Sequence, residues 1–323
     1  MTFNQLVYTL ARPIGGLRLA RYLARRHPRI LMYHRVNGGN GVDGLNVDVF
    51  REQLRMIKKD FHPMALDDLV KAGERGTLPD NAVALTFDDG YRDFYEHAFP
   101  LLEEMGLPAT LFVTTGFVSG ELWLWPDQLK YVLENTNQKY LNLSELEASL
   151  ETAAQRHVAW NTLGDTCLVI SNSEKIALIK RVAQALEVEL PFGSPERYRG
   201  LTWRMVKEMS DSGLDIGSHS VSHPILTQVT NSELQRELTE SRMKIEVEIG
   251  KPAHSFCYPN GQRADLDQRT REAVINAGYQ YALVAFPTSA SLQDPWAIGR
   301  YAGTSNMAVF EKCLYGFTFL GTR

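Results

Sequence analysis

Hydrophobic residues along the chain fall into short continuous runs that alternate with longer amphipathic stretches. The runs are rich in β-branched and aromatic residues, which is typical of buried strands, and they cover residues 30–34, 83–87, 110–114, 214–217, 255–258 and 279–286. Helical periodicity covers residues 93–105, 232–249 and 267–277, and each stretch stops just before a glycine. Such an alternation predicts a mostly parallel sheet wrapped by helices.

The region from about residue 121 to residue 200 departs from this alternation, because its periodicity is helical throughout. It predicts helices over residues 126–135, 144–158 and 173–190, the second opened by a capping-box pattern at Ser144-Glu145-Leu146-Glu147. We therefore expect a helical insertion between two strands of the main domain. Trp123 and Trp125 in this region could stack on sugar rings, and packing in the core is the alternative.

Composition sets broad bounds on fold and partners. The 323 residues are 44% hydrophobic and 22% charged, which fits a globular protein with a sizeable core. A net charge of -4 gives no reason to expect a nucleic-acid partner. The three cysteines are widely scattered and predict free thiols rather than a disulfide framework. No stretch approaches the roughly 20 apolar residues of a membrane span.

The N-terminal 28 residues are unusually rich in arginine, and no Asp or Glu precedes Asp43. On a helical wheel the basic and apolar side chains separate, which predicts a basic amphipathic helix within residues 1–28. Two interpretations stay open: a helix packed on the domain with its arginines in water, or a helix on an anionic membrane surface. Arg12-Pro13 interrupts the apolar stretch too early for a secretory signal. We therefore expect a cytoplasmic protein, peripheral on the inner face of the cell membrane under the second interpretation.

Two clusters of polar side chains follow predicted strands. Asp88 and Asp89 come directly after the run at residues 83–87, and Gly90 permits a sharp bend there. His219 and His223 follow the run at residues 214–217. Catalytic groups of α/β folds gather at the carboxyl ends of strands, and imidazole is a common metal ligand. A solvated turn would explain the paired Asp alone, but one Asp and two His together predict a catalytic metal site with an open position.

These segments resemble the polysaccharide deacetylase family, also described as NodB-homology or carbohydrate esterase 4 proteins. TFDDG at 86–90 and HSVSHP at 219–224 resemble its two metal-site motifs, and FCYPNG at 256–261 resembles its third. LMYHRV at 31–36 is similar to the circularly permuted members that deacetylate poly-N-acetylglucosamine. The resemblance covers about residues 29–115 and 201–301. It implies a distorted (β/α)7-type barrel over residues 29–323, with the insertion at about 121–200 between the two metal-binding motifs.

The resemblance also implies roles for single residues. Asp89, His219 and His223 would hold one divalent metal ion, with zinc as the first choice and cobalt, nickel, iron or manganese as alternatives. The catalytic roles implied are general base for Asp88, general acid for His34 and oxyanion stabilisation by the backbone N–H of Tyr258. Relatives pair the base with an Arg at the start of the third motif, where this sequence has Phe256, so Arg300 is the first candidate for that role and Arg263 the alternative. By its position before the His motif, Asp215 either orients a ligand imidazole or is a solvated strand residue.

The predicted function is hydrolysis of the N-acetyl group of an amino sugar, in a polysaccharide or a lipid-linked glycan precursor. Two alternatives are weighed against it. One is another amide hydrolase on the same fold, such as a deformylase or a cyclic ureide or imide hydrolase. The other is a non-catalytic glycan-binding relic. The expected partners are an N-acetylated saccharide and an anionic membrane surface contacted by the Arg-rich N-terminus.

Overall fold

Parallel strands form the centre of the molecule, as the runs of hydrophobic residues predict. The computed structural model describes residues 15–38, 44–288 and 292–320. Within these ranges the main sheet has the order β11-β10-β9-β6-β5-β1-β12, and β4 (His62–Pro63) pairs with β5 off this path. The strands on the path are β1 (Arg29–Tyr33), β5 (Ala82–Phe87), β6 (Thr110–Val113), β9 (Asp215–Ser218), β10 (Ser255–Cys257), β11 (Tyr281–Leu283) and β12 (Tyr301–Ala302). Every pairing in this sheet is parallel.

One short C-terminal segment joins the two edges of the sheet. Ile298 forms a parallel bridge with Leu283 of β11, and Tyr301 pairs with Leu31 of β1. Residues 298–302, which include β12, thus pair with both β11 and β1, and the sheet curls into a distorted barrel. The predicted fold class is confirmed. This closing segment was not predicted, because β12 is only two residues long and carries no hydrophobic run.

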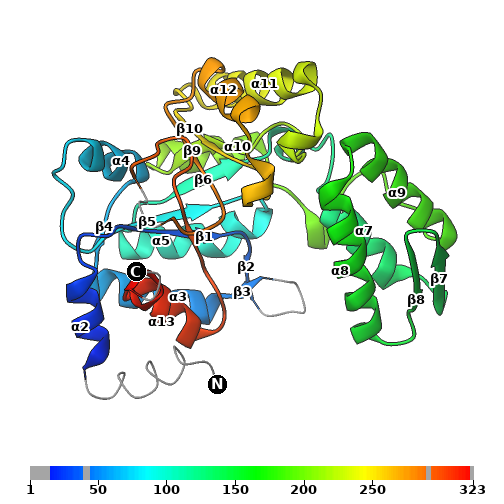
Figure 1. Cartoon of the computed structure of the whole chain (residues 1–323), viewed down its shortest axis with the longest axis horizontal. Coiled ribbons are helices and arrows are strands. Elements are labelled where there is room, and N and C mark those ends of the chain that lie inside the picture. The colour runs from blue at the N-terminus through cyan, green and yellow to red at the C-terminus, as the bar shows by residue number, and fades with distance from the viewer. Residues whose placement is uncertain (1–14, 39–43, 289–291, 321–323) are drawn as a thin grey trace.

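Helices cover the outside of the curled sheet (Figure 1). The main ones are α3 (Val47–Asp60), α4 (Leu66–Glu74), α5 (Phe99–Met105), α10 (Trp203–Asp211), α11 (Asn231–Ile249), α12 (Gln268–Asn276) and α13 (Met307–Leu314). The predicted helix at 232–249 matches α11, which opens with a capping box at Thr230 and ends at Gly250 in the left-handed conformation. The largest core cluster lies between the sheet and these helices, with Leu31, Leu85 and Phe50 fully buried.

The insertion projects from the barrel on the right of Figure 1 and has a hydrophobic core of its own. It consists of α7 (Trp125–Asn135), the antiparallel hairpin β7 (Tyr140–Leu143) and β8 (Leu146–Ser149), then α8 (Ala153–Val169) and α9 (Asn172–Ala185). The prediction of a helix over residues 144–158 is wrong for its first half. Leu141, Leu143, Leu146 and Ala148 alternate with polar residues, which favours a strand pair, and the capping box that opens α8 lies at Thr152.

The N-terminal helix α2 (Gly16–Leu23) packs on the domain through its small residues, because Ala20 and the following Ala24 are buried. Arg21 pairs with Asp60 at 2.9 Å. Leu19, Tyr22 and Leu23 are 60%, 60% and 57% exposed. Arg21 thus binds the helix to the domain, while an apolar stripe faces outward. The rest of the predicted N-terminal segment, residues 1–14, lies outside the described residues. No helix in the described ranges is long and apolar enough to cross a bilayer.

Candidate active site

Asp88 and Asp89 lie at the carboxyl end of β5, where the strand bends sharply. The backbone N–H of Asp88 still donates to Tyr33 of β1 at 2.9 Å, so the strand pairing continues to this residue. Asp89 and Gly90 then adopt φ values of 76° and 92°. A left-handed conformation is costly for a residue with a side chain, and such strain is concentrated at functional sites. Both carboxylates are buried, so the bend brings two neighbouring acids into the barrel.

His219 and His223 lie in the loop that follows β9, the strand next to β6 in the sheet. The N–H of His219 donates to Val113 at 2.9 Å and extends the β6–β9 pairing by one residue. Ser220 and His223 have φ values of 68° and 56°, so this loop is also strained. The two left-handed residues turn the loop back on itself, and the two imidazole rings come to a centroid separation of 4.8 Å.

Glu237 of α11 holds this loop in place, and sequence reasoning missed it. Its carboxylate accepts hydrogen bonds from the backbone N–H groups of Val221 and Ser222 at 2.8 and 2.9 Å, and from the Ser222 hydroxyl at 2.6 Å. Glu237 is buried. It shares its face of α11 with Leu234 and Leu238, so an acid at a core position of the helix was the available signal.

The side chains of Asp89, His219 and His223 converge. The Nε2 atoms of His219 and His223 lie 3.6 and 3.4 Å from Oδ1 of Asp89, and one ligand atom from each residue lies within 4.8 Å of the others. Within the described ranges no hydrogen bond reaches the Asp89 carboxylate. Burial raises the pKa of Asp89 and lowers that of His223 well below its ordinary value. A largely buried cluster of three electron-pair donors facing one point fits a divalent cation.

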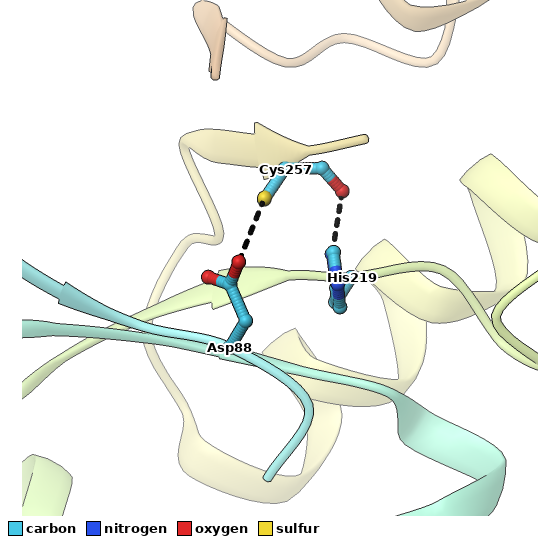
Figure 2. A group of neighbouring side chains, drawn as sticks. All are labelled: Asp88, His219 and Cys257. Atoms are coloured by element: carbon cyan, nitrogen blue, oxygen red, sulfur yellow. Dashed lines mark hydrogen bonds between the residues drawn. The ribbon is translucent and has the colours of Figure 1, made fainter. Parts of the chain in front are cut away.

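Asp88, His219 and Cys257 form a second group of side chains that could offer ligand atoms (Figure 2). Here, however, the donors are already engaged. Nδ1 of His219 hydrogen-bonds to the Cys257 carbonyl at 2.7 Å, and the Cys257 thiol contacts Asp88 at 3.6 Å. Fixing Nδ1 in this way turns Nε2 of His219 toward Asp89, as expected for an imidazole oriented by a carbonyl. The Asp89 set therefore fits a metal ion better than this one.

Arg300 occupies the space beside Asp88. It lies in the segment that closes the barrel, and its Nη1 and Nη2 donate to the two Asp88 oxygens at 2.7 Å each. Nη1 also contacts the Thr86 hydroxyl at 3.1 Å. Burial raises the pKa of Asp88, but Arg300, with smaller contributions from His219 and His34, lowers it by more, so the carboxyl stays ionised. Arg263, the alternative, lies instead over the ring of Phe286, 4.4 Å from its centroid.

His34 follows β1 and lies at the opening of the site. Its Nε2 is 3.9 Å from Oδ2 of Asp88, and its side chain is 48% exposed. This imidazole can therefore exchange a proton with solvent while it faces the base. Asp215, considered as an orienting acceptor for a ligand imidazole, accepts a hydrogen bond from Thr110 at 3.0 Å, and the acceptor for His219 is the Cys257 carbonyl.

The structure does not leave the backbone N–H of Tyr258 free for an oxyanion. This N–H donates to the Leu283 carbonyl of β11 at 3.1 Å, and the Tyr258 side chain is buried against Phe256. Pro259 has no N–H. The next one along the loop belongs to Asn260, which has a φ of 58° and donates to no acceptor in the described part of the chain. The pairing between β10 and β11 therefore extends one residue further than the motif suggested.

The two tryptophans at the start of the insertion differ in their surroundings. Trp123 is buried beside Tyr198 and Tyr131, as expected for core packing. Trp125 packs partly against the core of the insertion, and the Nζ of Lys175 lies 5.2 Å from its ring centroid. Neither arrangement is an open platform for a sugar ring.

Comparisons with known proteins agree on one family. The polysaccharide deacetylase family matches residues 75–139 and 170–282 of this chain. YxkH of Bacillus subtilis is 22% identical over 296 residues, which are 86% of this chain and 72% of YxkH. The poly-beta-1,6-N-acetyl-D-glucosamine N-deacetylase of Escherichia coli K12 is 36% identical over 67 residues, 20% of this chain. The chain spans only 10% of the length of that second relative.

A solved structure shows the same fold. IcaB from Ammonifex degensii superposes with a TM-score of 0.58 at 17% identity, over 90% of this chain and 96% of that one. At this identity the likeness concerns the curled parallel sheet and its helices.

Proposed function

The chain belongs to the polysaccharide deacetylase family, and we propose that it is a metal-dependent hydrolase that removes the N-acetyl group from an amino sugar in a glycan. The observation that carries the proposal is the convergence of Asp89, His219 and His223 beside the Asp88–Arg300 pair. Three ligands leave a position open for water or substrate, which is typical of catalytic rather than structural sites. Zinc is the first choice, because two imidazoles and one carboxylate suit it.

Asp88 is assigned as the general base. When bound, a divalent ion would polarise the acyl oxygen and lower the pKa of a water molecule from about 15.7 toward about 7. Asp88 would accept a proton from the attacking water molecule, because Arg300 keeps it ionised in a buried position. The water oxygen then forms a bond to the acyl carbon.

His34 is assigned as the general acid. The C–N bond breaks only when the nitrogen receives a proton, because an unprotonated amine is a poor leaving group. His34 lies on the open side of Asp88 and is half exposed, so it can donate a proton to the nitrogen and recover one from solvent. The products are acetate and a sugar with a free amine.

For the oxyanion we propose the backbone N–H of Asn260 in place of that of Tyr258. The loop that contains Asn260 follows directly from β10, whose last residue, Cys257, contacts both Asp88 and His219. A free donor in such a loop is suited to a developing negative charge, and removing one donor of this kind typically costs about 3 kcal/mol.

The substrate is proposed to be a glycan precursor close to an anionic membrane on its cytoplasmic side. The exposed stripe of Leu19, Tyr22 and Leu23 supports this, because α2 is also basic and Arg18 is exposed beside the stripe. Leu19→Glu with Leu23→Glu should lower cosedimentation with anionic vesicles, whereas Val247→Glu on α11 should not. Equal sedimentation of the double variant and the wild type would remove the membrane from the proposal.

Acetate release tests the catalytic proposal. Purified protein loaded with Zn²⁺ is incubated with N-acetylglucosamine oligomers, and acetate and formate are measured separately. Asp89→Ala and His223→Ala should abolish acetate release, and His62→Ala, an exposed histidine, should not. Formate release from N-formyl substrates, or opening of a cyclic ureide, without acetate release would favour the other amide hydrolases. A bound oligomer with no turnover under any metal would favour a binding protein.

A further inference from the structure

The insertion contains a groove that the proposed chemistry does not use. The groove has a volume of about 380 Å³ and lies between α7 and α8. Its walls are formed mainly by Lys130, Glu134, Arg156, His157 and Trp160. None of these residues belongs to the motifs shared with the family's metal site.

The lining combines a fixed aromatic surface with polar groups at its rim. The Trp160 ring lies nearly parallel to the His157 imidazole, with an interplanar angle of 20° and centroids 5.9 Å apart. Its indole N–H donates to the Pro126 carbonyl at 3.1 Å, which fixes the ring. Arg156 donates to the carbonyls of Leu150 and Leu133 at 2.8 and 2.6 Å. The groove is therefore largely preformed, which lowers the entropic cost of binding.

The polar groups of the rim carry both signs. Lys130 and Glu134 lie 3.8 Å apart, and Glu134 also accepts hydrogen bonds from Arg197 and Tyr198, so these polar groups are held in place at the rim. A purely basic groove would suit phosphate, and a purely apolar one would suit a helix or a lipid. A pyranose ring has an apolar face of C–H groups and a circumference of hydroxyls. Aromatic surface with a few fixed donors and acceptors matches that pattern.

The side of α7 that contributes Lys130 and Glu134 to the groove also contacts the loop after β5. Asp127, Lys130 and Glu134 are spaced so that they share one side of the helix. Asp127 accepts a hydrogen bond at 2.6 Å from Tyr91, the residue that follows Gly90. A turn of helix rises about 5.4 Å, so Lys130 and Glu134 lie about one and two turns beyond this contact.

A second chain of contacts runs from the groove to the opening of the site. Glu134 accepts a hydrogen bond from Arg197 at 2.9 Å, and the Arg197 carbonyl accepts one from Arg35 at 2.8 Å. Arg35 directly follows His34, the half-exposed residue beside Asp88. These contacts connect the lining of the groove, through Glu134 and Arg197, to the residue next to His34.

We propose that this groove binds sugar units of the glycan at a distance from the unit that is deacetylated, so that the preferred substrate is an oligosaccharide or polysaccharide chain. The proposal rests on the proposed function, because it places the reacting unit at Asp88. Binding on Trp160 adds affinity for long chains and leaves a short substrate unaffected. Loss of one stacking ring should weaken the binding of a long chain by about five- to tenfold.

Binding to an inactive enzyme separates this inference from catalysis. Asp88→Asn is titrated calorimetrically with a β-1,6-linked N-acetylglucosamine pentamer and dimer. Trp160→Ala and His157→Ala are then added in that background, and Phe192→Ala, which removes a 97% exposed ring on the insertion, is the matched control. Trp160→Phe keeps a ring in the partly buried position, so it should retain most of the affinity if Trp160→Ala folds poorly.

The expected result is a five- to tenfold loss of pentamer affinity for Trp160→Ala, no change for the dimer, and no change for Phe192→Ala. In the active enzyme, Trp160→Ala should raise KM for the pentamer and leave kcat unchanged. Equal pentamer affinity with and without Trp160, or no binding of either oligomer, overturns the groove as a glycan site. Trp160-dependent binding without acetate release in the wild type would support the groove and refute the catalytic proposal.

Discussion

Replacing Arg300 should disable the base without disturbing the metal ligands. Arg300 donates to both Asp88 oxygens at 2.7 Å, and both side chains are almost completely buried. Arg300→Met leaves a buried carboxylate without its partner, and breaking such a pair typically lowers the free energy of unfolding by about 3–5 kcal/mol. A positioned general base typically contributes about 10²- to 10⁴-fold to the rate, so disabling it should lower kcat/KM by about two to four orders of magnitude.

The pH dependence of kcat/KM gives the sharper readout. Burial raises the pKa of Asp88, and in the wild type Arg300 is the main group that offsets this, ahead of His219 and His34. Without Arg300 the effect of burial on the Asp88 pKa is opposed only by the smaller effects of His219 and His34, so Asp88 becomes protonated at higher pH and the acid limb of the profile moves upward. Arg300→Lys keeps the charge but loses the bidentate geometry. The acid limb of its pH profile should therefore lie between those of the wild type and Arg300→Met.

The assay is acetate release between pH 4 and pH 9 at saturating metal, with bound metal measured on the same samples. Arg300 contacts none of Asp89, His219 and His223, so metal content should equal that of the wild type. An acid limb of Arg300→Met that coincides with the wild-type limb would refute the role of Arg300. Loss of metal together with activity would mean that Arg300 acts on the site as a whole.

The remaining predictions concern the ligand loop, a buried lysine and the metal. Glu237→Gln removes the charge that holds the N–H groups of Val221 and Ser222 and should weaken zinc affinity by about 10- to 100-fold, with little change in the far-ultraviolet circular dichroism. Lys175 is 3% exposed, and burial lowers its pKa from 10.5 to about 8. Below pH 8 the buried charged amine therefore destabilises the folded state to its full extent. This destabilisation decreases as the pH rises from 8 to 10.5. Lys175→Met should raise the free energy of unfolding by about 2–3 kcal/mol at pH 7 and by much less at pH 10.5, measured by urea titration, and an equal gain at both values would contradict this. Removing the metal with a chelator should abolish acetate release, and adding Zn²⁺ should restore it; activity that survives complete metal removal contradicts the proposed mechanism.

The sequence predicted those parts of the structure in which a local pattern has one physical meaning. Continuous hydrophobic runs predicted the strands of the barrel, because parallel strands covered on both faces need apolar residues throughout. A helix that ends at a glycine predicted α11 with its end at Gly250. The same reasoning failed at residues 144–149, where a capping-box pattern competed with the alternation of a hairpin.

The site was predictable where its residues form motifs and not where they come together through tertiary contacts. Asp88, Asp89, His219 and His223 directly follow strands, and the fold brings them into one cluster. Glu237 resembles any acid on an amphipathic helix until the loop that it holds is known. The occupied N–H of Tyr258 depends on strand pairing with Leu283, which no pattern within its own motif reveals.

The central claim is that one cation lies among Asp89, His219 and His223. Anomalous diffraction from crystals of the zinc-loaded protein, recorded above and below the zinc absorption edge, tests it directly. The account predicts one strong peak about 2.0–2.2 Å from a carboxylate oxygen of Asp89 and from the Nε2 atoms of both histidines. A peak between Asp88, His219 and the Cys257 sulfur, or no peak at full zinc loading, would contradict it.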